Sequence, residues 1–259
     1  MKNKSKQKLK NLSEFKGKVV LITGSGRGIG AELALNFGLA GAKVIINYLH
    51  SKKKALKLVK KLKNIDVEVC PIKADVSKRK QVEKMINLTV SKYNTIDILI
   101  NNAAVLPKPM GWKKISPKDW ERTMQVNTQG MFECCRAVAP IMLKKKGSKI
   151  VNISTLGGGT FIAAYIASKT AINHLTKAFA QELAPNINVN AVALSKIEVG
   201  MGKPDNKQVA DSYISETPMK RLGKISDVVN AVFYLASKNS DFITGQILVV
   251  DGGRSIRAL

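Results

Sequence analysis

Cysteine and histidine are scarce in this chain, which has three of the first and two of the second in 259 residues. Three cysteines cannot form a disulfide framework, and Cys134 and Cys135 are adjacent in a predicted helix, so their side chains point in different directions. This cysteine usage is typical of a reduced compartment, and we expect a cytoplasmic protein. No group of histidine, cysteine and carboxylate residues has metal-ligand spacing, so we expect no metal site.

Long apolar runs are also absent. No stretch of eighteen apolar residues occurs, and no apolar segment follows the basic residues near Met1, so we expect neither a transmembrane helix nor a signal peptide. Apolar residues nevertheless make up 45% of the chain, which is enough for a substantial core. We predict one domain over residues 15–259, preceded by a flexible basic tail over residues 1–14.

Acidic residues are few: 18 stand against 43 lysines and arginines, which gives a net charge of +25 at pH 7. A basic surface favours anionic partners, such as phosphorylated cofactors, acidic carrier proteins, coenzyme A esters or nucleic acid. Lysines that merely cover exposed helix faces would give the same balance, and we favour that interpretation. No basic motif is interleaved with aromatic residues, so specific nucleic-acid recognition is not expected.

Short apolar runs alternate with helical patterns along almost the whole chain. This alternation predicts an α/β fold with a three-layer, doubly wound parallel sheet and a ligand site at the carboxyl ends of its strands. Ser77 and Ser226 are predicted to cap two of the helices. We predict strands over residues 18–22, 42–48, 67–74, 96–100, 149–153, 187–193 and 246–250.

A glycine-rich turn follows the first predicted strand. Residues 23–30 read TGSGRGIG and lead into a helical pattern. Glycines let the main chain approach a pyrophosphate closely, and the start of a helix offers free N–H groups and the positive end of the helix dipole. In this strand-turn-helix context the turn predicts a dinucleotide site.

The end of the second predicted strand indicates which dinucleotide binds. A carboxylate there would accept hydrogen bonds from the ribose 2′-hydroxyl of NAD, but residues 47–52 read NYLHSK and contain none. His50, Ser51 and Lys52 could instead hold a 2′-phosphate, together with Arg27 from the glycine turn. We therefore favour NADP(H) over NAD(H), although Lys52 also begins an exposed, lysine-rich helical pattern.

Tyr165 and Lys169 are four residues apart, which places them on one face of a helix. The predicted strand before that helix ends in two hydroxyls, Ser154 and Thr155, which alternation directs to opposite faces. A nearby ammonium stabilises a phenolate and lowers the pKa of tyrosine, which would make Tyr165 a usable general acid or base. Asn127, in the middle of another helical pattern, is either functional or the site of a kink.

These motifs together resemble the classical short-chain dehydrogenases/reductases. The turn at residues 23–30 matches T-G-x-x-x-G-x-G, and residues 101–104 (NNAA) match N-N-A-G except at the last position. Asn127 stands at the family's helix asparagine, and Tyr165 and Lys169 match Y-x-x-x-K. Residues 242–253 (FITGQILVVDGG) are similar to the end of 3-oxoacyl-(acyl-carrier-protein) reductases. The resemblance covers residues 15–259 and implies a Rossmann fold.

The resemblance implies a role for each matched residue. Tyr165 would protonate the substrate carbonyl, and Lys169 would bind the nicotinamide ribose and lower the pKa of Tyr165. Asn127 would hold a water for proton relay, and Thr155 would orient the carbonyl. Asp75 would meet the adenine, and Asn102 the adenosine-side ribose. The implied cofactor-binding set is Gly24, Ser25, Arg27, Gly28, Ile29, Gly30, His50, Ser51, Lys52, Asp75, Val76, Asn102, Ala103, Ala104, Tyr165, Lys169 and Ile197.

The chain departs from the family pattern at three places. Thr155 replaces the usual catalytic serine, and the interval from Thr155 to Tyr165 is about three residues short and contains three successive glycines, residues 157–159. Leu194 and Ser195 replace a Pro-Gly pair, and Val199 replaces the threonine that bonds the nicotinamide amide. These changes affect the substrate loops and leave the cofactor fold intact.

We therefore predict an NADP(H)-dependent oxidoreductase that transfers hydride between the nicotinamide and a carbonyl or secondary alcohol substrate, most similar to 3-oxoacyl reductases. The alternative is a catalytically weak NADP-binding member with a regulatory or assembly role. The resemblance also suggests a homotetramer, and the basic surface fits an acidic carrier protein or coenzyme A ester. The substrate itself is a small carbonyl compound or an acyl thioester.

Overall fold

The computed structural model describes residues 14–107, 113–156, 163–202, 204 and 206–258. Residues 1–13 of the predicted tail and the three glycines at 157–159 lie outside the described residues. Glu14, at the end of the predicted tail, accepts a hydrogen bond from the main-chain N–H of Lys238. Phe15 is buried and packs edge-on against Phe37 and Phe233. Phe15 therefore belongs to the core of the described residues, and the domain boundary at residue 15 stays a prediction.

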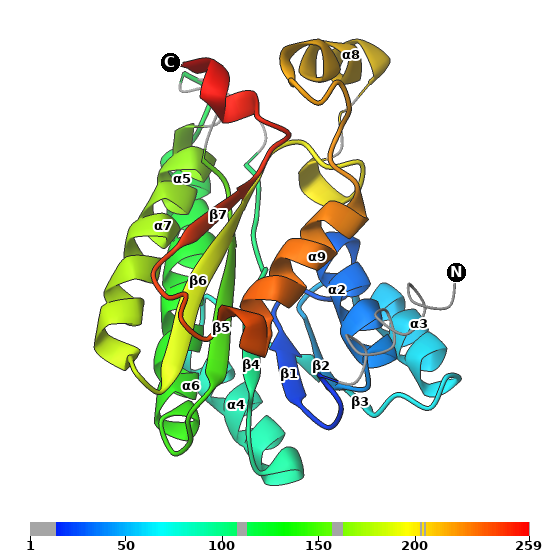
Figure 1. The fold of residues 1–259 in the computed structure, drawn as a ribbon, viewed down its shortest axis with the longest axis vertical. Coiled ribbons are helices and arrows are strands. Elements are labelled where there is room, and N and C mark those ends of the chain that lie inside the picture. The colour runs from blue at the N-terminus through cyan, green and yellow to red at the C-terminus, as the bar shows by residue number, and fades with distance from the viewer. Residues whose placement is uncertain (1–13, 108–112, 157–162, 203, 205, 259) are drawn as a thin grey trace.

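A seven-stranded parallel sheet forms the centre of the molecule, in the order β3-β2-β1-β4-β5-β6-β7 (Figure 1). This confirms the predicted Rossmann fold. The strand order reverses direction between β1 and β4, which is where dinucleotide-binding sheets form their crevice. The strands are β1 (Val19–Ile22), β2 (Lys43–Tyr48), β3 (Val69–Lys73), β4 (Ile98–Asn101), β5 (Ser148–Ser154), β6 (Ile187–Leu194) and β7 (Ile247–Val250).

Helices cover both faces of the sheet and make the outer two layers (Figure 1). Within β1, Val20 and Ile22 pack toward one layer, whereas Val19 and Leu21 pack toward the other. The first layer contains α2 (Gly28–Leu39), α3 (Lys52–Lys63) and α9 (Ile225–Ala236), and the second contains α4 (Arg79–Tyr93), α6 (Gly130–Met142) and α7 (Ala163–Leu183). The five inner strands are thus buried on both faces, which explains their nearly continuous apolar sequences.

The two edges of the sheet differ. Strand β3 is one edge and carries Pro71, which has no N–H to donate and is tolerated where a strand has a free side. Strand β7 is the other edge, and its residues are only partly buried, with Val249 exposed. The sequences of the two edge strands therefore account for the difference between the edges.

Both predicted serine caps are wrong. Helix α4 begins at Arg79, and the Ser77 hydroxyl instead donates to the Asp75 carboxylate at 2.7 Å. Helix α9 begins at Ile225, before Ser226, and the Asp227 carboxylate accepts the Lys224 N–H at 2.7 Å. In each case a carboxylate, which is a stronger acceptor than a hydroxyl, organises the turn.

Two further helices complete the part of the fold that the structure describes. Helix α5 (Pro117–Met124) begins at the capping residue Ser116 and runs through a π-helical turn, Gln125–Gln129, into α6. Helix α8 (Lys207–Glu216) has no buried residue and stands above the carboxyl ends of the strands, beside the C-terminal segment (Figure 1). Because α8 has no apolar face buried in the core, its sequence gave no strong helical signal.

Gly24 marks the closest approach between two loops above the reversal point. Its φ is +64°, and a Cβ added there would lie 2.8 Å from the Cα of Ala103, which follows β4. Gly17 has a similar φ of +75°, but a Cβ there would meet nothing within 4 Å. The two glycines therefore separate the cost of backbone conformation from the cost of crowding.

We expect Gly17→Ala to destabilise the fold by about 1 kcal/mol, the cost of a left-handed non-glycine residue. Gly24→Ala should cost about 3 kcal/mol, because the main chain of Ala103 must also move. Urea unfolding of both variants measures the difference. Equal losses would show that the two loops separate without resistance.

Candidate functional site

Thr23 joins the two loops at the reversal point. Its hydroxyl oxygen accepts the main-chain N–H groups of Asn102 and Ala103 at 2.9 and 3.0 Å. In return, the Asn102 side chain donates to the carbonyl oxygens of Thr23 and Gly24 at 2.9 and 3.3 Å. A Cβ at Gly30 would lie 2.5 Å from that Asn102 amide nitrogen. The Asn102 side chain thus holds the glycine turn, and its predicted ribose contact stays a prediction.

Asn47 ties the same turn to the neighbouring strands. Its side-chain oxygen accepts the Gly24 N–H at 3.0 Å, and its carbonyl oxygen accepts the Ser25 N–H at 2.8 Å. The Asn47 amide group donates to the Ala74 carbonyl at 3.1 Å. The Ser25 hydroxyl donates to the Ile22 carbonyl, so it serves the turn. Sequence reasoning missed Asn47, whose signal is a buried amide at the end of an apolar strand.

The start of α2 fits a pyrophosphate. Its N-cap residue, Arg27, makes no side-chain capping bond, and no acidic residue occurs in the first turn, so the N–H groups from Gly28 and Ile29 onward keep their positive field. A Cβ at Gly28, where φ is +57°, would lie 3.2 Å from the Cα of Gly200. The segment that follows β6 therefore reaches the start of α2.

The residues predicted to hold a 2′-phosphate are only partly brought together. Ser51 packs on the glycine turn, where a Cβ at Gly26 would lie 2.2 Å from its hydroxyl oxygen. His50 and Lys52 are exposed and do not line the adjoining groove of about 590 Å³ between α2 and α3. Arg27 does line that groove. The other residues that line the groove are Gly26, Gly28, Ala31, Lys54, Lys57, Leu58, Lys60, Lys61 and Asn64.

Asp75 uses its carboxylate within the protein. One oxygen accepts the N–H and hydroxyl of Ser77, and the other accepts the Arg122 guanidinium at 3.3 Å. Partial burial raises the pKa of Asp75, but the Ser77 hydrogen bonds and Arg122 outweigh it, and the net pKa is lowered. Val76 is buried against Gly130. The adenine contacts of both residues stay predictions.

The Lys169 side chain is buried next to Tyr165, the tyrosine that the sequence predicts to be catalytic. Only 2% of Lys169 is exposed, and its ammonium donates to the Ile153 carbonyl at 2.7 Å. The ammonium lies 5.7 Å from the centre of the Tyr165 ring. Burial lowers the pKa of Lys169 to about 8. The predicted neighbourhood of these two residues is therefore present in the fold.

The predicted effect of Lys169 on Tyr165 is wrong for the protein without its cofactor. Burial raises the pKa of Tyr165 to about 12, and Lys169 does not offset this. The physical reason is the orientation of Lys169, whose ammonium faces the Ile153 carbonyl and the tyrosine ring. Tyr165 is consequently a protonated phenol at neutral pH, suited to donate a proton.

Asn127 lies in the π-helical turn Gln125–Gln129 and is 1% exposed. Its side chain accepts the Val105 N–H at 2.8 Å and donates to the Val105 carbonyl and the Ser168 hydroxyl, both at 3.0 Å. Ser168 in turn donates to the Tyr165 carbonyl at 2.7 Å. Asn127 therefore connects the loop after β4 to the helix that carries Tyr165. Sequence reasoning missed Ser168 as the link.

Ser154 and Thr155 point in different directions, as alternation predicts. The Ser154 hydroxyl bonds Asn173 of α7 at 2.6 Å and is buried. The Thr155 hydroxyl donates to the Leu194 carbonyl at the end of β6, at 2.7 Å. Thr155 is half-buried and directly follows β5 at the carboxyl end of the sheet, where the crevice is predicted.

The segment after β6 is anchored without the family's Pro-Gly pair. The Ser195 N–H donates to the Val250 carbonyl at 3.3 Å, and buried Ile197 forms a bridge with Gly223. Val199 packs against the apolar core on the α2 side. Its isopropyl group fills space where the family has a hydroxyl, so this residue has no side-chain donor for a nicotinamide amide.

Within the described ranges, no three histidine, cysteine or carboxylate residues are close enough to hold a metal ion. No helix among the described residues is both long enough and apolar enough to cross a membrane.

The fold is that of a dinucleotide-binding sheet, and Tyr165 and Lys169 lie close together near the carboxyl ends of its strands. The family model described as "Enoyl-(Acyl carrier protein) reductase" matches residues 24–255. The 3-oxoacyl-(acyl-carrier-protein) reductase of Staphylococcus epidermidis is 35% identical over 240 residues, 91% of this chain and 98% of that protein. The corresponding Thermotoga maritima reductase is 36% identical over 243 residues, 92% and 98% of the two chains.

Solved structures show the same likeness. A gluconate 5-dehydrogenase from Burkholderia cenocepacia, crystallised with NADP and tartrate, superposes with a TM-score of 0.87 at 33% identity, over 95% of this chain and 98% of that one. The chain belongs to the short-chain dehydrogenases/reductases. It is an NAD(P)-dependent oxidoreductase that acts on a CH–OH or carbonyl group.

The burial of Lys169 should make stability depend on pH. Its pKa falls from 10.5 to about 8 on folding, so between these values the unfolded chain keeps a proton that the folded protein lacks. The stability of the wild type relative to Lys169→Met should therefore rise by about 3 kcal/mol from pH 8 to pH 10.5.

Urea unfolding of the two proteins without cofactor, at several pH values, measures this rise. Other titrating groups are common to both proteins and cancel in the difference. A difference that stays constant with pH would show that Lys169 keeps an ordinary pKa in the folded state.

Proposed function

We propose that this protein is an NADP(H)-dependent carbonyl reductase of the short-chain family. The observation that carries this proposal is the position of Tyr165, a half-buried phenol held protonated above a buried ammonium, at the carboxyl edge of the sheet. When bound, the nicotinamide cofactor supplies or accepts the hydride. The chain's own residues then handle the proton and the placement of the substrate.

Tyr165 donates its phenolic proton to the carbonyl oxygen as that oxygen gains negative charge. A pKa of about 12 keeps this proton on Tyr165 at neutral pH, so the phenol is in the form that donates during carbonyl reduction. Lys169 is mostly protonated at pH 7 and binds the ribose hydroxyls. If the bound cofactor and substrate bring the Lys169 ammonium closer to the Tyr165 oxygen, the ammonium would stabilise the phenolate and lower the pKa of Tyr165 in the complex.

Asn127 fixes the helix that carries Tyr165, through Ser168, and holds the relay water. Thr155 orients the substrate carbonyl by donating to its oxygen. The Leu194 carbonyl, which accepts the Thr155 hydroxyl in the free protein, competes with the substrate for that hydrogen. The added methyl group of threonine restricts this rotation, and we assign part of the substrate selectivity to it.

The cofactor is NADP(H). Arg27, Lys54 and Lys57 surround the groove beside the glycine turn, and no carboxylate lines it. This positive charge favours the 2′-phosphate of NADP and does not oppose the parts that NADP and NAD share. The solved gluconate 5-dehydrogenase was crystallised with NADP, which supports the same choice.

The substrate is a carbonyl compound or an acyl thioester. Two similar proteins are named as 3-oxoacyl-(acyl-carrier-protein) reductases, so an acyl thioester on an acidic carrier protein is one candidate, and the basic surface of this chain suits it. A small oxo acid is the other, because a similar structure is a gluconate 5-dehydrogenase. We place the reaction in the cytoplasm, where its three free cysteines would stay reduced.

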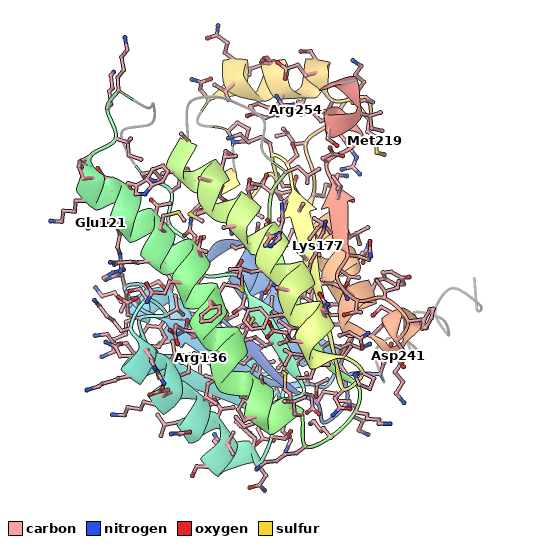
Figure 2. The ribbon with its side chains drawn as sticks, turned by 90° about the vertical axis from the view of Figure 1, so that its left-hand side faces the viewer. Glu121, Arg136, Lys177, Met219, Asp241 and Arg254 are labelled. Atoms are coloured by element: carbon pink, nitrogen blue, oxygen red, sulfur yellow. The ribbon has the colours of Figure 1, made fainter. Side chains whose placement is uncertain are left out.

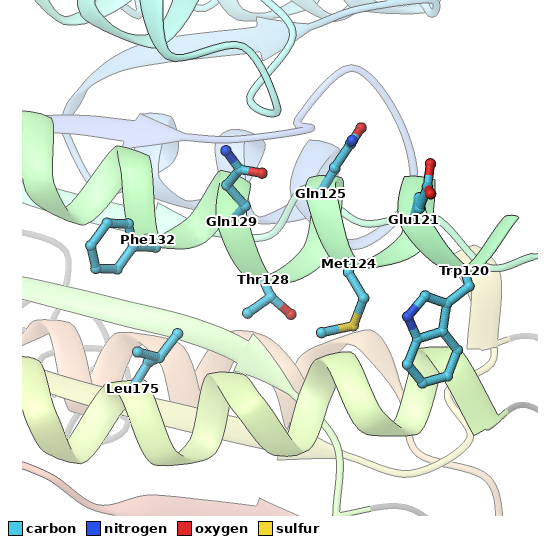
Figure 3. Close-up of a pocket in the computed structure, with 8 residues that line it drawn as sticks. All are labelled: Trp120, Glu121, Met124, Gln125, Thr128, Gln129, Phe132 and Leu175. Atoms are coloured by element: carbon cyan, nitrogen blue, oxygen red, sulfur yellow. The ribbon is translucent and has the colours of Figure 1, made fainter. Parts of the chain in front are cut away.

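We also propose a homotetramer. A groove of about 440 Å³ lies between α7 and the continuous run of α5, the π-helical turn and the start of α6, and its rim includes exposed Trp120 and Phe132. Figure 3 shows Met124 and Thr128 directed toward α7, while Glu121 and Gln125 point away from it. An apolar rim of this kind suits a contact between copies, and edge strand β7 offers a second.

Tyr165→Phe should lower kcat with NADPH by about 1,000-fold, because the phenyl ring cannot donate a proton. The assay follows NADPH absorbance with a panel of ketones, oxo acids and 3-oxoacyl thioesters. Tyr234→Phe, which changes an exposed tyrosine on α9, is the matched control and should keep wild-type activity. Tight NADPH binding by the wild type without any turnover would favour the regulatory alternative.

Arg27→Ala should weaken NADPH binding by roughly 10- to 100-fold and NADH binding by much less, because a charge-assisted bond to the 2′-phosphate is lost. Fluorescence titration with both cofactors measures the ratio. Lys63→Ala removes an equal charge from the far end of α3, outside the groove, and is the control. Equal weakening for the two cofactors would contradict the proposed specificity.

A further inference from the structure

Lys196 lies two residues after Leu194, the last residue of β6. The Leu194 carbonyl accepts the Thr155 hydroxyl at 2.7 Å. Four residues after Lys196, Gly200 reaches the start of α2, where the pyrophosphate is proposed to bind. The segment that contains Lys196 therefore connects the end of β6, at Thr155, to the start of α2.

The Lys196 side chain turns toward α8. Its ammonium lies 5.1 Å from the centre of the Tyr213 ring, and the Arg254 guanidinium lies 4.0 Å from the centre of the same ring. Arg254 pairs with Glu216 of α8 at 2.5 Å. Figure 2 places Arg254 next to α8, above the carboxyl ends of the strands. Three separate segments thus bring two cations to one aromatic ring.

The two cations differ in how their charge is balanced. Arg254 has the carboxylate of Glu216, whereas the Lys196 ammonium makes no ion pair or hydrogen bond with the described residues. Lys196 is half-buried, so part of its hydration is lost, and the ring of Tyr213 replaces only some of it.

We propose that Lys196 binds a carboxylate of the substrate, and that the substrates are therefore oxo acids, reduced to hydroxy acids. This inference rests on the proposed reductase function and names its substrate class. A carboxylate supplies the counter-charge that Lys196 lacks and accepts its N–H groups, while Thr155 and Tyr165 hold the carbonyl oxygen. Tyr213 and Arg254 keep α8 over the bound acid.

The test compares acids with their neutral methyl esters. Wild-type enzyme and NADPH are assayed with straight-chain 2-, 3-, 4- and 5-oxo acids and the matching esters. We expect the best acid to exceed its ester in kcat/KM. Lys196→Met should raise KM for that acid by roughly 10- to 100-fold, with a much smaller change for the ester, and Lys196→Arg should restore most of the preference.

Two controls separate binding from structure. Lys207→Met removes an equal charge from an exposed position on α8 and should leave the acid-to-ester ratio unchanged. Arg254→Met loosens α8 from the other side of Tyr213 and should lower acid and ester rates alike. Wild-type preference for esters, or equal losses for acid and ester in Lys196→Met, would overturn the proposal.

A binding measurement decides the point even without turnover. Calorimetric titration of 4-oxopentanoate into the NADP-saturated protein should give heat with the wild type and at least tenfold weaker binding with Lys196→Met. If no carbonyl compound is reduced but this binding difference holds, the reductase proposal fails and the carboxylate site stands. Absence of binding to the wild type overturns the carboxylate site.

Discussion

The Lys169 ammonium is 2.7 Å from the Ile153 carbonyl and almost fully buried, and no carboxylate among the described residues pairs with it. A charge in this position is costly unless the surrounding dipoles are fixed. The fixing comes from the sheet, since Ile153 lies inside β5 with hydrogen-bonded strands on both sides. It also comes from α7, where Asn173 bonds Ser154 of β5 and Ser168 bonds Asn127 of the π-helical turn. These bonds hold the dipoles around the Lys169 ammonium in place, which lowers the cost of burying its charge.

At the cofactor end, too, side chains hold the structure in place while main-chain groups face the ligand. Thr23, Asn47 and Asn102 use their side chains to bond loops to one another, which leaves glycine main chain and the start of α2 facing the crevice. The polar residues that look most like ligands in the sequence are therefore partly structural. The main chain that they position provides the surface for the pyrophosphate.

The sequence predicts the seven strands well because each is a short, mainly apolar run, and the five inner ones are buried on both faces. It predicts the pair Tyr165 and Lys169 from helical spacing alone. It could not predict the direction of the Lys169 ammonium, because that depends on a carbonyl in another element, and the inferred pKa of Tyr165 was therefore wrong. The caps at Ser77 and Ser226 failed for a related reason. In each turn a carboxylate accepts the local hydrogen bond, Asp75 from the Ser77 N–H and Asp227 from the Lys224 N–H, and residue propensity does not reveal such bonds.

Residues that act through tertiary contacts were the ones that sequence reasoning missed. Lys54 and Lys57 belong to a lysine-rich helix, and only the packing of α3 beside α2 distinguishes them from the other lysines. Lys196 lies in a stretch without periodicity, and its aromatic neighbour is on α8, a helix whose apolar signal is weak. Such residues are distinguished by the residues that pack beside them in the fold, and composition and spacing do not reveal these neighbours.

The unequal edges of the sheet limit how copies of this chain can share it. At the β3 edge, Pro71 removes a donor from the middle of a five-residue strand, so an added strand would find a broken ladder there. Only the β7 edge offers continuous main-chain donors and acceptors. Two copies that meet at β7 through a two-fold axis would form one sheet with β3 at both outer ends. Such a sheet has no further edge suited to growth, so pairing through strands closes at two copies and does not propagate into a fibre.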